Sequence, residues 1–96
     1  MAAYFIVDQL EVTDPETMKE YSAGIGATLA KFNAKALVRG GAFETLEGDY
    51  RPKRMIMLEF SDMATLKAWY DSEDYAELKA MRHRSSSANI VAVEGL

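Results

Sequence analysis

The chain has 96 residues, of which 49% are hydrophobic and 27% charged, with a net charge of −4 at pH 7. This length suits one domain spanning residues 1–96, and the composition is that of a folded, soluble protein. The acidic balance argues against nucleic acid or an anionic membrane as the main partner. Because there is no cysteine, disulfides and thiolate chemistry are excluded. No run approaches the ~20 apolar residues of a membrane span, and the N-terminus does not resemble a signal peptide, so a cytoplasmic location is expected.

The first part of the chain predicts a strand followed by a helix. Residues 4–12 are rich in β-forming side chains. Asp14 suits a helix N-cap and Pro15 the first helical position. Asn33 tolerates the left-handed conformation that ends many helices. Between these signals, apolar residues recur at spacings of three and four, which indicates one face of an amphipathic helix: Met18, Tyr21, Ile25, Leu29 and Phe32.

The second part predicts two strands, a divided helical region and a last strand. One strand is expected over residues 35–46, with Gly40-Gly41 marking a bulge or a close backbone approach. A turn over 47–52 leads to a strand over 53–60. A helix starts at Ser61-Asp62, and Asp71-Ser72 divides the helical region in two. Serines 85–87 are interpreted as a loop before a strand over 89–93. The apolar helical positions are Met63, Leu66, Trp69, Tyr70, Tyr75, Leu78 and Met81.

This order, β-α-β-β-α-β, predicts a ferredoxin-like α+β fold. Its antiparallel sheet should have the strand order 4-1-3-2, with the helices on one face. The strands are apolar on both sides: in the first, Tyr4, Ile6, Leu10 and Val12 alternate with Phe5 and Val7. The helices can cover only one of these faces. A homodimer that packs sheet against sheet is therefore predicted.

A set of short motifs in a fixed order runs along nearly the whole chain. They are Val12-Thr13-Asp14-Pro15 with Tyr21, Leu37-Val38-Arg39-Gly40-Gly41, Leu46-Glu47-Gly48, Glu59-Phe60, Ala68-Trp69-Tyr70-Asp71-Ser72, Tyr75, Arg82 and Glu94-Gly95. In these motifs the chain resembles the bacterial family called domain of unknown function 1330, within the dimeric α+β-barrel superfamily. It departs from the family at Glu73, often a proline, and at Asn33 or Ala34, often a glycine. The resemblance implies the fold and the homodimer, but no established reaction.

Arg82 is the first candidate for a binding residue. It lies seven residues after Tyr75 and four after Leu78, so it shares their apolar helix face. An arginine directed toward the sheet requires an acceptor, because a buried unpaired charge is costly. That acceptor could be Glu59, Glu47 or the carboxylate of a ligand. The alternatives are an internal ion pair, or a helix-end side chain reaching outward to solvent.

The other candidates are a second arginine and four aromatic residues. Arg39 precedes the glycine pair and belongs to the resemblance; a single Arg-Gly-Gly triplet in an acidic chain argues little for RNA binding. The aromatic residues could line a cleft between helices and sheet, although aromatics at helical spacing more often form plain core. These are Tyr21, Trp69, Tyr70 and Tyr75.

Several other chemistries are not favoured. Gly24-x-Gly26 lacks the preceding strand and the third glycine of a dinucleotide-binding loop. His83, the only histidine, lies between Arg82 and Arg84, whose charges disfavour its protonation and metal binding. No spacing indicates a metal site or a catalytic triad. No cofactor is expected.

Three functions are compatible with the sequence. The first is a dimer that binds a small anionic or aromatic molecule in a cleft between helices and sheet. The second is a cofactor-free oxygenase or isomerase of small aromatic substrates, by analogy with related α+β barrels; fold by itself does not determine function. The third is a structural or interaction module.

Overall fold

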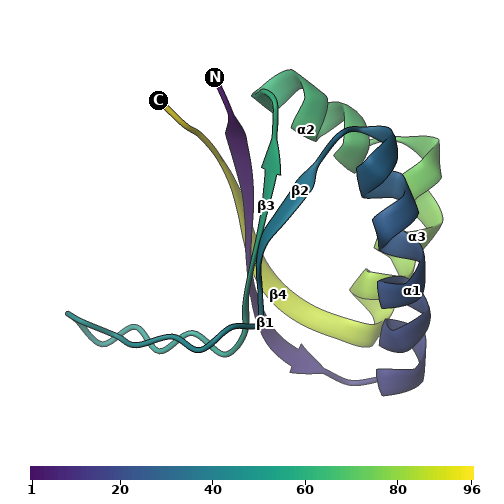
Figure 1. Ribbon diagram of the computed structural model, residues 1–96. Helices are drawn as coiled ribbons and strands as arrows, with labels where there is room; N and C mark the ends of the chain where they lie inside the picture. The colour runs from purple at the N-terminus through teal and green to yellow at the C-terminus, as the bar shows by residue number, and fades with distance from the viewer.

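The computed structural model describes residues 1–96 and confirms the predicted order of elements. The elements are β1 (Ala3–Val12), α1 (Pro15–Lys31), β2 (Lys35–Arg39), β3 (Met55–Phe60), α2 (Met63–Tyr70), α3 (Glu73–Ser85) and β4 (Ser86–Glu94). The antiparallel sheet has the order β2-β3-β1-β4, which is the predicted order read from the other edge. All three helices lie on one side of the sheet (Figure 1). The α+β ferredoxin-like prediction is confirmed. No helix is both long and apolar enough to span a membrane.

The helix boundaries follow the capping residues. Asp14 Oδ1 accepts a hydrogen bond from Thr17 N at 3.3 Å, and Pro15 occupies the first helical position. Asn33 has φ of 56°, the left-handed conformation expected after α1. The predicted division after α2 is present, because Ser72 Oγ caps α3 by accepting from Tyr75 N at 3.2 Å. These local signals account for where the helices begin and end.

The densest part of the core lies where α2 covers the sheet. Trp69 is fully buried and stacks on Tyr75, with ring centroids 4.1 Å apart. Its ring also contacts Phe5 and Phe60, at centroid distances of 5.2 and 5.3 Å. The indole N–H donates to Thr28 Oγ1 on α1 at 3.0 Å, so the single polar atom of the ring is satisfied.

The two long helices pack against each other at a glycine. A Cβ built on Gly24 of α1 would lie 2.9 Å from Cδ2 of Leu78 on α3. The absence of a side chain at Gly24 therefore permits the close approach of α1 and α3. This contact holds α1 on α3, whereas α2 packs directly on β1 and β3.

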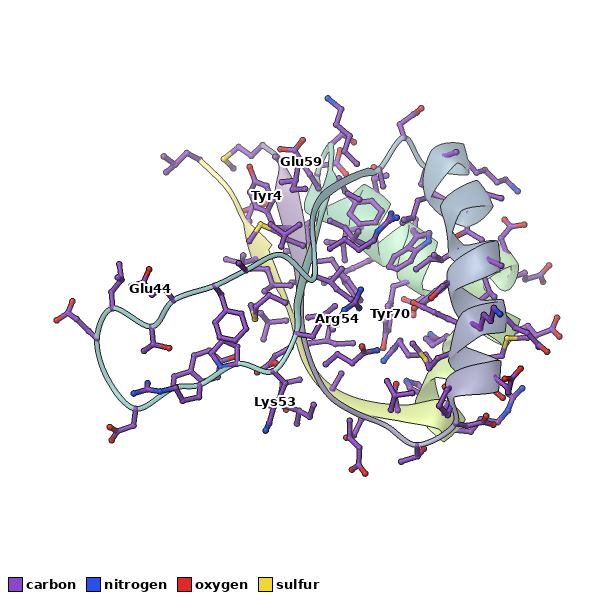
Figure 2. The ribbon with its side chains drawn as sticks, turned by 60° about the horizontal axis from the view of Figure 1, so that its bottom comes forward. Tyr4, Glu44, Lys53, Arg54, Glu59 and Tyr70 are labelled. Carbon is purple, nitrogen blue, oxygen red and sulfur yellow. The ribbon has the colours of Figure 1, made fainter.

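Strand β2 is much shorter than predicted: it ends at Arg39, not at residue 46. Gly40 N donates to Met55 O at 2.7 Å, and the φ of +67° at Gly40 then turns the chain away from the sheet. Residues 40–54 form an irregular arm that projects from the sheet on the side away from the helices (Figures 1 and 2). The strand predicted over 53–60 accordingly begins at Met55. At the base of the arm, Tyr50 Oη donates to Asp8 Oδ2 at 2.6 Å.

The serine patch is not the loop that the sequence indicated. Ser85 ends α3 and Ser86 begins β4, with no residue between the two elements. The hydroxyls of Ser85 and Ser86 donate to the carbonyls of Met81 and Arg82 at 2.6 and 2.9 Å. They therefore satisfy acceptors in the last turn of the helix, which makes a separate connecting loop unnecessary.

A register shift between Gln9 and Glu11 interrupts the pairing of β1 with β4. Both strands curve toward the helices at this end of the sheet (Figure 1), as bulged strands do. The shift interrupts the alternation of side chains between the two faces of the sheet. The face on which Leu10 and Val12 lie therefore cannot be deduced from that of Tyr4 and Ile6 by counting residues.

Candidate ligand-binding pocket

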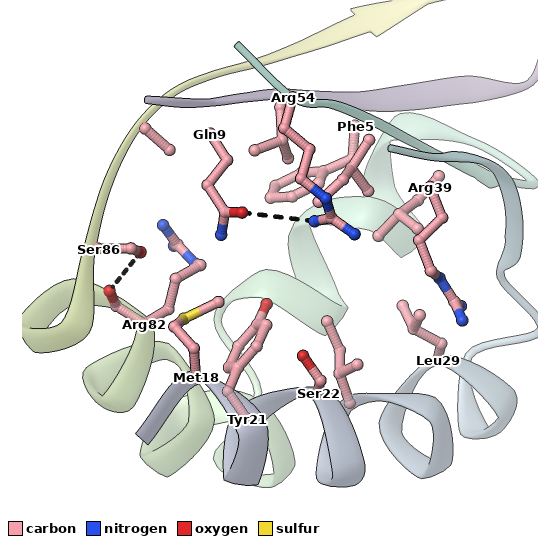
Figure 3. Close-up of a pocket in the computed structure, with 15 residues that line it drawn as sticks. Phe5, Gln9, Met18, Tyr21, Ser22, Leu29, Arg39, Arg54, Arg82 and Ser86 are labelled. Atoms are coloured by element: carbon pink, nitrogen blue, oxygen red, sulfur yellow. Dashed lines mark hydrogen bonds between the residues drawn. The ribbon is translucent and has the colours of Figure 1, made fainter. Parts of the chain in front are cut away.

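A cavity of about 120 Å³ lies between α1 and the sheet, with the end of α3 at one side. At this end of the molecule α1 packs closely on α3, whereas α2 is the helix that lies against β1 and β3. Its walls are mostly apolar: Phe5 and Val7 from β1, Ile56 and Leu58 from β3, and Ile25 and Leu29 from α1. Figure 3 shows the polar side chains that converge on this space from both layers.

Arg82 is the buried charge of the cavity. Arg82 is only 8% exposed, and it lines the cavity near the end of α3. The two ion pairs of the chain are Lys31–Asp74 and Lys79–Asp71, so no carboxylate lies within 4.0 Å of the Arg82 guanidinium. A buried guanidinium without an acid partner is uncommon, because removing the charge from water costs free energy that an anion would normally offset.

Two tyrosine hydroxyls adjoin the Arg82 side chain. Arg82 Nε donates to Tyr75 Oη at 3.3 Å, and Tyr75 Oη lies 2.7 Å from Tyr21 Oη. Burial, reinforced by the neighbouring Tyr75, raises the pKa of Tyr21 well above its ordinary value. Burial by itself would lower the pKa of Arg82, but the hydrogen bond to Tyr75 and the nearby tyrosines raise it overall. At neutral pH the cavity therefore contains a cationic guanidinium and a protonated Tyr21.

Two further arginines lie at the rim of the cavity. Arg39 ends β2, and Arg54 immediately precedes β3; both are exposed and line the cavity. Arg54 Nη1 donates to Oε1 of Gln9 at 3.4 Å (Figure 3). Because Oε1 accepts this bond, the amide N–H groups of Gln9 remain available as donors. The rim is therefore positively charged and contains no acidic side chain.

The structure brings three of the sequence-predicted candidates to the cavity, together with residues that were not predicted. Arg82, Arg39 and Tyr21 line it. Arg54 and Gln9 were missed. They come together because β1 pairs with β3 and Gln9 N donates to Arg54 O at 2.9 Å. The predicted strand pairing could have indicated this contact, but not the side of the sheet that Arg54 reaches.

The other candidates lie elsewhere. Trp69 and Tyr75 are fully buried in the core behind the cavity, and neither lines it. Tyr70 is half-buried beside them, with Lys79 Nζ 4.1 Å from its ring centroid. Glu59 pairs with Tyr4 and Lys35 on β1 and β2, between the inward-facing Leu58 and Phe60. Its side chain thus belongs to the opposite face of the sheet and makes no ion pair with Arg82.

The exposed His83 ring lies beside the cavity. Arg82 Nη2 lies 3.3 Å from His83 Nε2, and since a guanidinium only donates, this nitrogen is the acceptor. Partial burial, together with the charges of Arg82 and Lys79, lowers the pKa of His83. The ring is therefore neutral at neutral pH, as the bond from Arg82 requires.

The cavity lining combines hydrogen-bond donors with apolar walls. It includes no carboxylate, imidazole or thiol, and the chain has no group of three or more acidic or histidine side chains that could hold a metal ion. This arrangement suits the binding of an oxygen-bearing anion with an apolar body. It offers no side chain suited to removing a proton from a bound molecule.

The sequence profile of the family described as Domain of unknown function (DUF1330) matches residues 2–96. No curated protein matches the sequence. Solved structures share the fold at low identity. A protein of unknown function from Rhodopseudomonas palustris is 12% identical with a TM-score of 0.74, over 99% of this chain and 82% of the other. A dimeric ferredoxin-like protein of unknown function from Jannaschia is 15% identical with a TM-score of 0.69, over 99% and 100%. SnoaB, a cofactor-independent oxygenase from Streptomyces nogalater, is 10% identical with a TM-score of 0.63, over 99% and 93%.

Proposed function

The chain belongs to the DUF1330 family, and we propose that it binds a small organic anion, a carboxylate with an apolar or aromatic body, in the cavity beneath α1. One observation carries this proposal: Arg82 is buried, lines the cavity and has no carboxylate partner in the chain. A bound carboxylate would supply the missing negative charge. The apolar walls would then bury the body of the ligand.

The site also supports entry of an anion. Arg39 and Arg54 lie at the rim, and the lining contains no acidic residue that would repel a carboxylate. Positive charge at an opening attracts anions from solution even when the protein as a whole carries a net charge of −4.

The test compares Arg82→Met with Arg84→Met. Both variants remove one positive charge from the same helix, but Arg84 is exposed and does not line the cavity. Calorimetric titration with a panel of aliphatic and aromatic monocarboxylates should show binding to the wild type and to Arg84→Met. Binding to Arg82→Met should weaken by about 1.5–3 kcal/mol, the usual range for a charged hydrogen bond. A wild type that binds no acid at millimolar concentration, while Arg82→Met melts at a clearly lower temperature, would make Arg82 a structural residue.

A cofactor-free oxygenase is a second candidate. Arg82 and the Tyr21 hydroxyl would stabilise an anionic oxygen such as a phenolate or an enolate. Because the cavity offers no side chain that removes a proton, the substrate would bind already ionised. It would also supply the electrons, as when the anion of an activated methylene group takes up a proton and reacts with O₂ to give a carbonyl group and water. Oxygen uptake with acidic phenols that depends on Arg82 would support this candidate. Binding of the phenols without any uptake of oxygen would exclude the oxygenase and would leave anion binding as the function of the site.

We also propose that the chain forms a homodimer through the sheet face away from the helices. That face carries apolar side chains; Val91 and Val93, for example, are 58% and 47% exposed. The arm lies on the same side of the sheet (Figure 1). Its residues Phe43, Leu46 and Tyr50 are exposed. A second copy would cover this surface.

Light scattering tests the dimer directly. The wild type should have twice the chain mass of 10.7 kDa. Val91→Glu combined with Val93→Glu should yield monomers, whereas Lys19→Glu on the exposed side of α1 should not. A wild type that scatters as a single chain at micromolar concentration would refute the dimer.

A further inference from the structure

The direction of one buried hydrogen bond decides which group Tyr21 presents to the cavity. Tyr75 Oη has two hydrogen-bond neighbours, Arg82 Nε and Tyr21 Oη. A guanidinium N–H can only donate, so the Tyr75 oxygen accepts from Arg82. The Tyr75 side chain is fully buried. Its own hydroxyl proton therefore has one acceptor within reach, the oxygen of Tyr21.

The opposite direction would leave a buried proton without an acceptor. If Tyr21 donated to Tyr75, the Tyr75 O–H would have no partner, an arrangement that folded proteins rarely contain. Tyr75 therefore donates to Tyr21. The hydroxyl proton of Tyr21 then has no acceptor in the protein. Because the Tyr21 side chain lines the cavity (Figure 3), this proton is available to a ligand there. The raised pKa of Tyr21 means that this proton is retained at neutral pH.

Tyr21 and Arg82 are adjacent donors. A single hydroxyl group, that of Tyr75, separates them, with contacts of 2.7 and 3.3 Å on its two sides. Two acceptor oxygens that meet these donors therefore lie close together in a ligand rather than at its opposite ends. A carboxylate at Arg82 with an uncharged oxygen on the neighbouring carbon has this spacing.

We infer that the ligand is a 2-oxo acid with an apolar side chain. The Tyr21 hydroxyl donates a hydrogen bond to the carbonyl oxygen next to the carboxylate. This inference rests on the proposed function of Arg82 as the carboxylate site. A carbonyl is preferred to a hydroxyl because it brings no proton that would itself need an acceptor. The side chain of the acid would lie against Ile25, Leu29 and Ile56.

The experiment uses a matched pair of acids, 4-methyl-2-oxopentanoate and 4-methylpentanoate, which differ only at the second carbon. Their affinities are measured by calorimetry at neutral pH for the wild type, Tyr21→Phe and Tyr75→Phe. The wild type should prefer the oxo acid by about fivefold, the contribution of one neutral hydrogen bond. Tyr21→Phe should bind both acids with the same affinity. Tyr75→Phe keeps the Tyr21 hydroxyl and should keep the preference, even if both affinities fall.

The ratio of the two affinities is measured within each protein. A general loss of stability in a variant would lower both affinities alike and would leave their ratio unchanged. A wild type that binds both acids equally would overturn the inference and leave the carboxylate site intact, because one carboxylate would then bridge Arg82 and Tyr21. A preference that survives in Tyr21→Phe would also overturn it. Failure of the wild type to bind either acid, with no other acid bound, would instead remove the proposed function itself.

Discussion

The layer between the helices and the sheet is closed at one end and open at the other. At the closed end α2 lies directly on the strands, and Trp69 fills the space together with Phe5, Phe60 and Tyr75. At the open end α1 packs on α3, and the space between α1 and the sheet is lined by residues that include Tyr21 and Arg82.

The difference shows how one small core can carry both stability and a binding site. The aromatic rings at the closed end stabilise the fold by burying apolar surface. The open end contains a guanidinium without an acid partner, an arrangement that adds little to stability and suits an anionic ligand. We therefore expect substitutions at the two ends to affect different properties of the protein.

The largest effect is expected at the closed end. Trp69→Ala should lower the free energy of unfolding by about 3–5 kcal/mol, because it removes a fully buried ring and leaves a cavity. Urea denaturation followed by circular dichroism measures this. Trp69→Phe serves as the control and should cost less, since it keeps an aromatic ring there. A loss below about 1 kcal/mol for the alanine variant would show that the closed end does not dominate stability.

Of the two adjacent glycines at the rim of the open end, only Gly40 should lower the stability of the protein when it is replaced by valine. Gly40 has φ of +67°, and a Cβ there would lie 2.6 Å from Arg54 Nε, whereas Gly41 has neither a positive φ nor a neighbour within 4 Å. Gly40→Val should cost about 1–3 kcal/mol. Gly41→Val should stay within about 0.5 kcal/mol of the wild type. Equal urea midpoints for the two variants would contradict the role assigned to Gly40.

Inside the open end, Arg82→Met should leave stability unchanged or raise it by up to about 2 kcal/mol without ligand. It replaces a buried cation that has no acid partner by an apolar side chain. Thermal unfolding in an acid-free buffer measures this, with Arg84→Met as the control for net charge. If Arg82→Met is less stable by more than about 1 kcal/mol, the arginine supports the fold through its bond to Tyr75.

The smallest effect concerns Asp8, on the sheet face away from the cavity. The hydrogen bond from Tyr50 Oη, aided by the one from Lys53 N, lowers the pKa of Asp8 below its ordinary value of 3.8. Its contribution to stability is therefore complete above pH 3.8 and is lost as the pH falls below that value. The melting temperature of the wild type should exceed that of Asp8→Asn near neutral pH.

This difference in melting temperature should narrow as the pH falls below 3.8. Asp49→Asn, in the arm, removes a carboxylate that makes no side-chain hydrogen bond in the structure, and it serves as the control for the loss of one negative charge. A difference for Asp8→Asn that stays constant to pH 2 would contradict the assigned role of its carboxylate.

Local signals in the sequence sufficed for the elements and their order. Asp14, Ser72 and Asn33 mark helix boundaries through groups within a few residues of each other. The same signals misjudged the second strand, because Gly40 was read as an interruption when its positive φ ends the strand. They also misjudged the serines, whose hydroxyls bond to carbonyls of the preceding helix turn.

What the sequence determined by itself was the fold class and the helix face on which Arg82 lies, because periodicity and capping depend on neighbours along the chain. Only the tertiary structure decided which aromatic residues are core and which line a cavity. Tyr21 and Tyr75 both occupy apolar helix positions, but Tyr21 lines the space between α1 and the sheet, whereas Tyr75 is fully buried against Trp69 of α2. The arrangement of the helices over the sheet depends on contacts such as that of Gly24 with Leu78, which join residues far apart in the chain. Periodicity along the chain carries no information about such contacts.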